Sequence, residues 1–159
     1  MSHAYQQVEI VVVLVYDESS NRLLADYNHR WEAFTLPMTK GHEIPSAIEN
    51  GPPTMETPLS AAIRAAVEVL GRPLSPFQLP EPMNIEIPMW EQSGRDGQWK
   101  RYHCLPFAMQ AYFEPQPLPG HSAIWLTPAE FLTHEPVSPT ARRILQAIPV
   151  AELRMVLGV

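Results

Sequence analysis

The stretch 57–70 is the clearest helix in the chain and constrains what the rest can fold into. Thr57 can cap its N-terminus, and Pro58 suits the first helical position, where no N–H is needed. Gly71 supplies the stop, and Pro73 prevents continuation. Apolar residues at helical spacing predict one buried stripe, formed by Leu59, Ile63, Ala66 or Val67, and Leu70.

The charged residues of this helix lie away from that stripe. Arg64 and Glu68 stand four residues apart, so we expect them to pair across one helical turn. Glu56 comes just before the first turn, where the helix N-terminus favours a carboxylate. The sequence therefore predicts an amphipathic helix with a charged outer face.

The size and charge of the chain narrow the function classes. Its 159 residues suit one domain with a real core. A net charge of −6 argues against a large surface for duplex nucleic acid, which needs clustered Lys and Arg. A small anionic ligand held by a few local groups remains compatible with that charge.

No stretch of the chain predicts a membrane segment. The longest apolar run, Ile10 to Val15, is far shorter than a membrane span. The start of the chain lacks the charged and apolar pattern of a signal peptide. We expect a cytoplasmic protein that does not contact membranes.

The pattern along the chain mixes strands with short helices. Strands are predicted at 8–16, 22–27, 33–36, 83–90, 99–113 and 123–126, the fifth bent or bulged at Pro106. Further helices are predicted at 128–133, from 139 to about 148, and at 150–157. Residues 1–6 read as a frayed end, 93–97 as a hairpin loop, and 38–56 as a long loop without an element.

This order, together with the residues of 36–71, resembles the Nudix hydrolase superfamily. The family's box has a Glu, seven residues, an Arg and a Glu-rich turn ending in Gly. The matching residues are Leu36-Pro37, Lys40, Glu56, Ala61-Ala62, Arg64, Glu68 and Gly71. The resemblance implies an α/β fold, a Nudix-type α/β/α sandwich with a mixed β-sheet, as a single domain over residues 1–159.

The box departs from the family pattern where the family binds metal. Ala65 and Val69 stand where the family has Glu, and the loop between Lys40 and Glu56 is longer than the family's. Positions 65, 68 and 69 share one helical face, where three carboxylates would bind Mg²⁺ or Mn²⁺ and so activate water against a pyrophosphate. Only Glu68 remains, so the cofactor is a weakly held Mg²⁺ or Mn²⁺ on Glu68, or none.

The resemblance also implies candidate site residues. Glu68 and Glu56 are candidate catalytic residues, and Arg30, Trp31 and Lys40 are candidate substrate-binding residues. Arg64 and Gly71 belong to the structural motif, with Arg64 tying the loop to the helix. From the residues alone, Glu68 is equally a surface partner of Arg64, Glu56 a first-turn carboxylate, and Arg30 a loop charge.

Three functions follow, and the sequence leaves open whether the chain is an enzyme. The first is a Nudix-like domain without efficient pyrophosphohydrolase activity that binds a small phosphorylated or nucleotide ligand or a partner; a homodimer is compatible with it. The second is an active Mg²⁺- or Mn²⁺-dependent pyrophosphohydrolase of nucleoside-diphosphate-type substrates, with a site rebuilt from Glu56, Glu68 and a carboxylate of the 41–55 loop. In that loop, His42, Glu43 and Glu49 are the candidates to fold back toward the helix. The third is a structural or interaction protein with a vestigial cleft.

Overall fold

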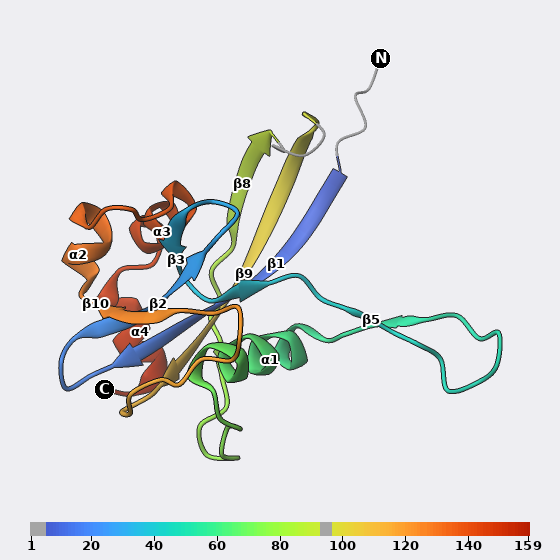
Figure 1. The fold of residues 1–159 in the computed structure, drawn as a ribbon, viewed down its shortest axis with the longest axis horizontal. Helices are drawn as coiled ribbons and strands as arrows, with labels where there is room; N and C mark the ends of the chain where they lie inside the picture. The colour runs from blue at the N-terminus through green and yellow to red at the C-terminus, as the bar shows by residue number, and fades with distance from the viewer. Residues whose placement is uncertain (1–5, 93–96) are drawn as a thin grey trace.

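The computed structural model describes residues 6–92 and 97–159 as a β-sheet covered by helices (Figure 1). The strands are β1 (Gln6–Asp17), β2 (Arg22–Asn28), β3 (Ala33–Thr35), β4 (Met38–Thr39), β5 (Glu43–Ile44), β6 (Thr54–Met55), β7 (Glu81–Pro82), β8 (Ile87–Gln92), β9 (Trp99–Gln110) and β10 (Ala123–Leu126). The helices are α1 (Pro58–Leu70), α2 (Pro128–Thr133), α3 (Pro139–Ala147) and α4 (Val150–Leu157).

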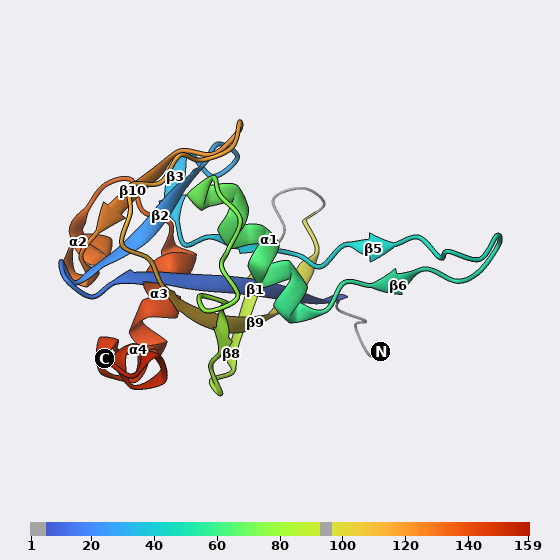
Figure 2. The ribbon, with the colours of Figure 1, turned by 90° about the horizontal axis from the view of Figure 1, so that it is seen from below.

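The main sheet is mixed, as the sequence predicts. Its strands follow the order β10-β2-β1-β9-β7, with β3 beside β2, β4 beside β1 and β8 beside β9. Strand β1 runs antiparallel to β2 and β4 but parallel to β9. Helix α1 covers one face, and α3 and α4 lie on the other (Figures 1 and 2).

Strand β1 carries apolar residues on both faces because both faces are covered. Val11, Val13 and Val15 belong to the core beneath α1. The residues between them, with Leu14 as an example, belong to the core beneath α3 and α4. All residues from Val11 to Tyr16 are buried, which confirms the predicted two-sided strand.

Helix α1 begins and ends as predicted. The Thr57 hydroxyl accepts the Ser60 N–H at 3.2 Å, and Gly71 adopts the left-handed conformation with φ 76°. The predicted apolar stripe is wrong at Leu59, which is 41% exposed. The buried residues are Ala61, Ala62, Ala65, Ala66, Val69 and Leu70. Small alanines let the helix lie close to the valines of β1, so the close contact falls on that side of the helix.

Strand β9 is shorter and less distorted than predicted. It ends at Gln110, and its register with β1 runs unbroken through Pro106, so the predicted bend or bulge is wrong. The carbonyl of Pro106 accepts the Met83 N–H at 2.9 Å, so the proline nitrogen faces the same edge. Pairing with β8 has ended by Cys104 and pairing with β7 starts at Phe107. Pro106 therefore lies where the edge strand needs no donor from it.

Two further strand predictions need correction. The strand predicted at 83–90 begins only at Ile87 and continues to Gln92. The stretch 38–56 is not a featureless loop but contains β4, β5 and β6. The hairpin loop at 93–97 and the frayed end at 1–6 fall largely on residues 93–96 and 1–5, which lie outside the described residues.

Strands β5 and β6 form an antiparallel ribbon, which together with its turn we call the arm (residues 41–56). The arm extends away from the sheet and helices (Figures 1 and 2). At its base, the Glu56 N–H donates to the His42 carbonyl at 2.7 Å. The extra residues between Lys40 and Glu56 therefore project from the domain and do not fold back over the sheet or α1.

The C-terminal part of the chain confirms its predicted helices. Thr127 and Glu130 form a reciprocal capping box at the start of α2, and the Ser138 hydroxyl accepts the Ala141 N–H at the start of α3. Within residues 6–92 and 97–159, no helix is long and apolar enough to cross a membrane.

Candidate functional site

The first half of α1 is tied to the loop before it through Arg64. Its guanidinium donates to both carboxylate oxygens of Glu56, at 2.9 and 3.2 Å, and to the Lys40 carbonyl at 2.9 Å. The Glu56 carboxylate also accepts the His42 N–H at 3.2 Å. Hydrogen bonds from Arg64 lower the pKa of Glu56 to about 2. Burial opposes this shift, and the hydrogen bond from the His42 N–H adds a smaller lowering effect.

The second half of α1 carries Glu68, which lies between Arg64 and His121. Its carboxylate is 3.8 Å from Arg64 Nη1, which confirms the predicted pair, and 3.4 Å from His121 Nε2. His121 Nδ1 lies 2.7 Å from Asp26 Oδ2, and the other Asp26 oxygen accepts the Ser122 N–H at 3.0 Å. A continuous polar chain therefore runs from the Glu56–Arg64 pair through Glu68 to His121 and Asp26.

His121 and Asp26 were missed by the sequence argument. They stand 95 positions apart, and neither belongs to a motif. The only related feature of the sequence is the Pro-rich stretch before His121. It predicts a stiff loop but does not predict which residues the His121 side chain contacts. Only pairing of β10 with β2 brings the two residues together.

The loop 114–121 lies against the C-terminal end of α1. The Gln116 N–H donates to the Leu70 carbonyl at 3.0 Å, and the Leu118 N–H donates to the Glu68 carbonyl at 2.9 Å. A Cβ on Gly71 would come within 1.5 Å of the Gln116 carbonyl oxygen. Gly71 is therefore required by this close approach as well as by its positive φ.

The face that would hold a divalent cation is built from core residues. Ala65 and Val69 are 4% and 2% exposed and pack in the core beneath α1. Neither offers a side-chain oxygen, and Glu68 already faces Arg64 and His121. Mg²⁺ requires near-octahedral oxygen coordination, and Ca²⁺-like sites need even more oxygens. The residues present do not fit an Mg²⁺ or Mn²⁺ site at this face.

The arm does not bring replacement ligands to Glu68. Glu43 and Glu49 are exposed on the arm, which leads away from the body (Figure 1). His42 contacts Glu56 through backbone atoms. Among the described residues, no three His, Cys, Asp or Glu side chains gather closely enough to hold a metal ion.

Two of the candidate substrate-binding residues line one cavity. This cavity, which we call the Arg30 pocket, has a volume of ≈ 430 Å³. Its size lies within the range of about 300–1,000 Å³ that is typical of ligand pockets. Arg30 and Trp31 form one wall, and His121 lies on the opposite loop. The Asn28 side chain accepts the N–H groups of Arg30 and Trp31, both at 3.0 Å, and so holds this wall in a tight turn.

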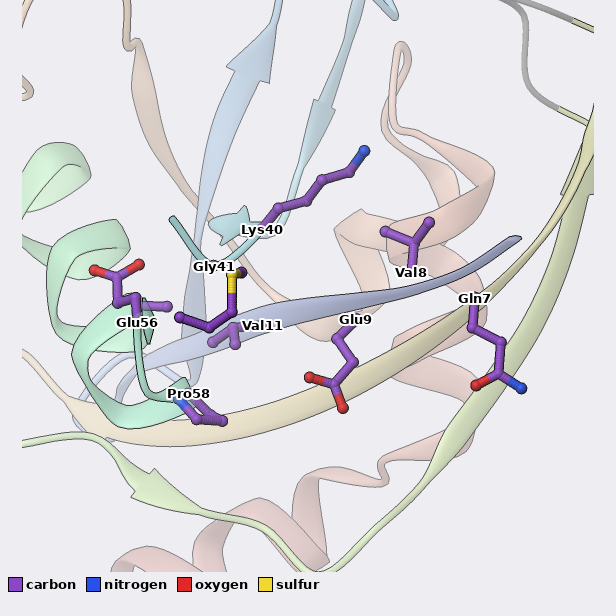
Figure 3. Close-up of a pocket in the computed structure, with 10 residues that line it drawn as sticks. Gln7, Val8, Glu9, Val11, Lys40, Gly41, Glu56 and Pro58 are labelled. Atoms are coloured by element: carbon purple, nitrogen blue, oxygen red, sulfur yellow. The ribbon is translucent and has the colours of Figure 1, made fainter. Parts of the chain in front are cut away.

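Lys40 lies elsewhere. It lines a second cavity of ≈ 350 Å³, the Lys40 groove, together with Glu56, Met55 and the N-terminal half of β1 (Figure 3). In Figure 3 the Lys40 ammonium points away from the Glu56 carboxylate. The structure therefore separates Lys40 from Arg30 and Trp31, which the sequence argument had grouped together.

We compared the chain with known families, curated sequences and solved structures. Neither a family model nor a curated protein sequence matches the chain. The MutT protein of Methanosarcina mazei Go1 superposes with a TM-score of 0.61 at 15% identity, over 90% of this chain and 92% of that one. The chain has the Nudix fold. The E. coli dihydroneopterin triphosphate pyrophosphohydrolase gives a TM-score of 0.60 at 14% identity, over 99% of this chain and 100% of that one.

A third structure with the Nudix fold contains a ligand. The Nudix domain of Shewanella oneidensis NrtR, solved in complex with ADP ribose, gives a TM-score of 0.57 at 16% identity. It covers 92% of this chain and 87% of its own. These three superpositions show the shared fold, and the predicted α/β/α sandwich is confirmed.

Proposed function

We propose that this chain is a single Nudix-fold domain, residues 1–159, that binds a small phosphorylated or nucleotide ligand without efficient pyrophosphohydrolase activity. The observation that carries the proposal is the state of the metal face. Ala65 and Val69 belong to the core, and Glu68 is held between Arg64 and His121. A pyrophosphate bound here would lack the divalent cation that neutralises its charge and activates water.

The Arg30 pocket supports ligand binding. Within the described part of the chain, the Arg30 guanidinium has no hydrogen-bond or ion-pair partner, so its donors remain available to a phosphate. Trp31 is 43% exposed at the same wall and can stack on a base. A cation beside an exposed aromatic ring suits an anionic ligand with an aromatic part, and the NrtR Nudix domain binds such a molecule.

A thermal-shift screen tests this proposal. The protein is heated with ADP ribose, nucleoside diphosphates and triphosphates, each with Mg²⁺, with Mn²⁺ and with EDTA. We expect at least one ligand to raise the melting temperature equally in all three conditions, because binding needs no metal. Arg30→Ala and Trp31→Ala should abolish the shift. Lys40→Ala, in the separate groove, should retain it and serves as the control.

The same samples test for hydrolysis. We expect no Mg²⁺- or Mn²⁺-dependent release of phosphate or nucleoside monophosphate. Robust turnover that Glu68→Gln abolishes would refute the proposal and favour the active pyrophosphohydrolase, with ligands supplied by the arm. The absence of any nucleotide binding at micromolar concentrations would instead favour the structural or interaction protein with a vestigial cleft.

A further inference from the structure

A smaller cavity adjoins the Arg30 pocket at Trp31. It has a volume of ≈ 220 Å³, and we call it the Ser138 cavity. Trp31 lines both cavities, so they share this residue in their walls. Because pockets that hold a whole small molecule typically measure about 300–1,000 Å³, the Ser138 cavity by itself fits only part of a ligand.

The two cavities also meet where the start of α3 packs on β3. The Ser138 N–H donates to the Phe34 carbonyl at 2.8 Å, and the Ser138 hydroxyl donates to the Thr35 hydroxyl at 3.2 Å. Thr35 lines the Arg30 pocket, and Ser138 lines the smaller cavity. Both residues are buried. Their hydrogen bond therefore makes the wall between the cavities a packed part of the domain.

The hydroxyl residues of the Ser138 cavity are already engaged within the chain. The Ser138 hydroxyl donates to Thr35 and accepts the Ala141 N–H at 3.1 Å. Thr140, the other hydroxyl residue, is buried and also has an interaction within the chain. A polar ligand group placed here would lose its hydrogen bonds to water, and the Ser138 hydroxyl could not replace them. Such a loss costs free energy.

The other lining residues give the Ser138 cavity an apolar wall. Trp31 contributes an indole ring, Ala33 a methyl group and Pro139 a pyrrolidine ring. None of the described residues that line the cavity carries a charge. A hydrocarbon group fits such a cavity, because burial of apolar surface is favourable and needs no hydrogen-bond partner.

The Arg30 pocket supplies the charge that the Ser138 cavity lacks. Asp26 also lines this pocket, but one of its carboxylate oxygens accepts the Ser122 N–H and the other lies 2.7 Å from His121 Nδ1. The Arg30 guanidinium has no such partner among the described residues. A guanidinium can bind one phosphate through two parallel hydrogen bonds.

We propose that the ligand of the Arg30 pocket is a phosphate monoester of a hydrocarbon group, with its phosphate on Arg30 and its hydrocarbon group in the Ser138 cavity. This inference rests on the proposed function and narrows its ligand class. A nucleobase in the Ser138 cavity would bury polar ring and exocyclic groups without partners, whereas an alkyl or aryl group buries none. Trp31 contacts both parts of the ligand, since it lines both cavities.

A series of alkyl phosphates tests this ligand class. The native chain is titrated with methyl, propyl and pentyl phosphate in EDTA, and each Kd is taken from amide shifts in two-dimensional NMR spectra. We expect the affinity to rise about fourfold for each methylene group that is buried. An affinity that does not depend on chain length would overturn the proposal.

Two variants of the wall test the location. Ala33→Leu fills the Ser138 cavity, so the rise with chain length should be lost while methyl phosphate still binds. Pro139→Asp places a charge in the same wall, at a first helical position that favours a carboxylate, and should weaken pentyl phosphate more than methyl phosphate. Ala151→Leu, an exposed position of α4 that lines neither cavity, is the control and should keep the rise. A full rise in both wall variants would overturn the proposal.

Further titrations separate this inference from the proposed function. Arg30→Ala should weaken methyl, propyl and pentyl phosphate by the same factor, because all three carry the phosphate. AMP and UMP are titrated under the same conditions. If they bind and the alkyl series is flat, the proposed function stands and only the hydrocarbon ligand is refuted. If neither the nucleotides nor the alkyl phosphates bind, both proposals fail.

Discussion

The two halves of α1 differ in what their charged residues do. In the first half, Arg64 binds Glu56 through two hydrogen bonds and the Lys40 carbonyl through a third, all within 3.2 Å. In the second half, the ion-pair distances from Glu68 are 3.4 and 3.8 Å, and its side chain is about one-third exposed, at 35%. The connection between α1 and the loop before it is thus tight, whereas Glu68 is held by longer contacts. The connection depends on contacts within the chain and needs no cation.

The largest change in the free energy of unfolding is expected when a second carboxylate is placed on the face of α1 that carries Glu68. Val69→Glu would place a charge at a position that is 2% exposed in the core beneath α1. We expect the free energy of unfolding to fall by at least about 3 kcal/mol, measured by urea denaturation. Leu59→Glu, on the exposed side of the same helix, should change it by less than about 0.5 kcal/mol. A stable Val69→Glu variant that binds Mn²⁺ would show that this face of α1 is accessible to a cation. The second half of the helix could then hold a metal ion, which contradicts the difference between the two halves described above.

Removing Arg64 should have the next largest effect. Arg64→Ala leaves the Glu56 carboxylate, only 10% exposed, without its main partner. We expect a loss of about 2–3 kcal/mol, since hydrogen bonds to charged groups are the costly ones to break. The amides of His42 and Glu56 should exchange faster with deuterium, because the base of the arm loosens. Arg64→Lys keeps the positive charge but cannot donate two hydrogen bonds to the Glu56 carboxylate in the same geometry. We therefore expect an intermediate loss of unfolding free energy. Equal stability of Arg64→Ala and the native chain would contradict the interpretation.

Low pH should selectively weaken the contact between Glu56 and Arg64 in the first half of α1. The pKa of Glu56 in the folded chain is about 2, below its ordinary value of 4.5. The ionised carboxylate therefore contributes its full stability above pH 4.5, and this contribution is lost as the pH falls toward 2. The difference in unfolding free energy between the native chain and Glu56→Gln should shrink over that interval. Other acidic groups are present in both proteins and cancel. A difference that stays constant across the interval would rule out this origin.

The smallest effect is expected at Glu68. Glu68→Gln removes only long, partly exposed ion pairs, so the free energy of unfolding should change by less than about 1 kcal/mol. Glu56→Gln, measured at neutral pH under the same conditions, should cost more. If Glu68→Gln proved the more damaging of the two, Glu68 would be the centre of the network and the comparison would be reversed.

The local chemistry of the sequence was enough to predict the ends of the helices and the buried strand β1. Thr57-Pro58 and Gly71 set the ends of α1, and Thr127 and Ser138 set the starts of α2 and α3. These signals are reliable because a cap satisfies backbone groups within a few residues of itself. The run of β-branched residues in β1 predicted burial on both faces for a similar reason, since alternate side chains always point to opposite faces.

Contacts between distant segments decided the rest. Helical periodicity predicted that Leu59 is buried. The close packing of α1 on β1 instead buries the alanines of the helix. The proline and glycine residues of 38–56 predicted a loop, yet pairing of β5 with β6 made it an arm. His121 reached Glu68 and Asp26 only through the sheet register and the fit of its loop around Gly71.

The sequence by itself determined that the helix face at positions 65, 68 and 69 has only one carboxylate, because Ala65 and Val69 have no side-chain oxygen in any fold. It also determined the capped helix that carries this face. Tertiary structure alone decided that His121 lies against Glu68 and that residues 41–56 form an arm. The physical reason is that side-chain chemistry is fixed by the residue, whereas the neighbours of a side chain depend on pairing and packing across the whole chain.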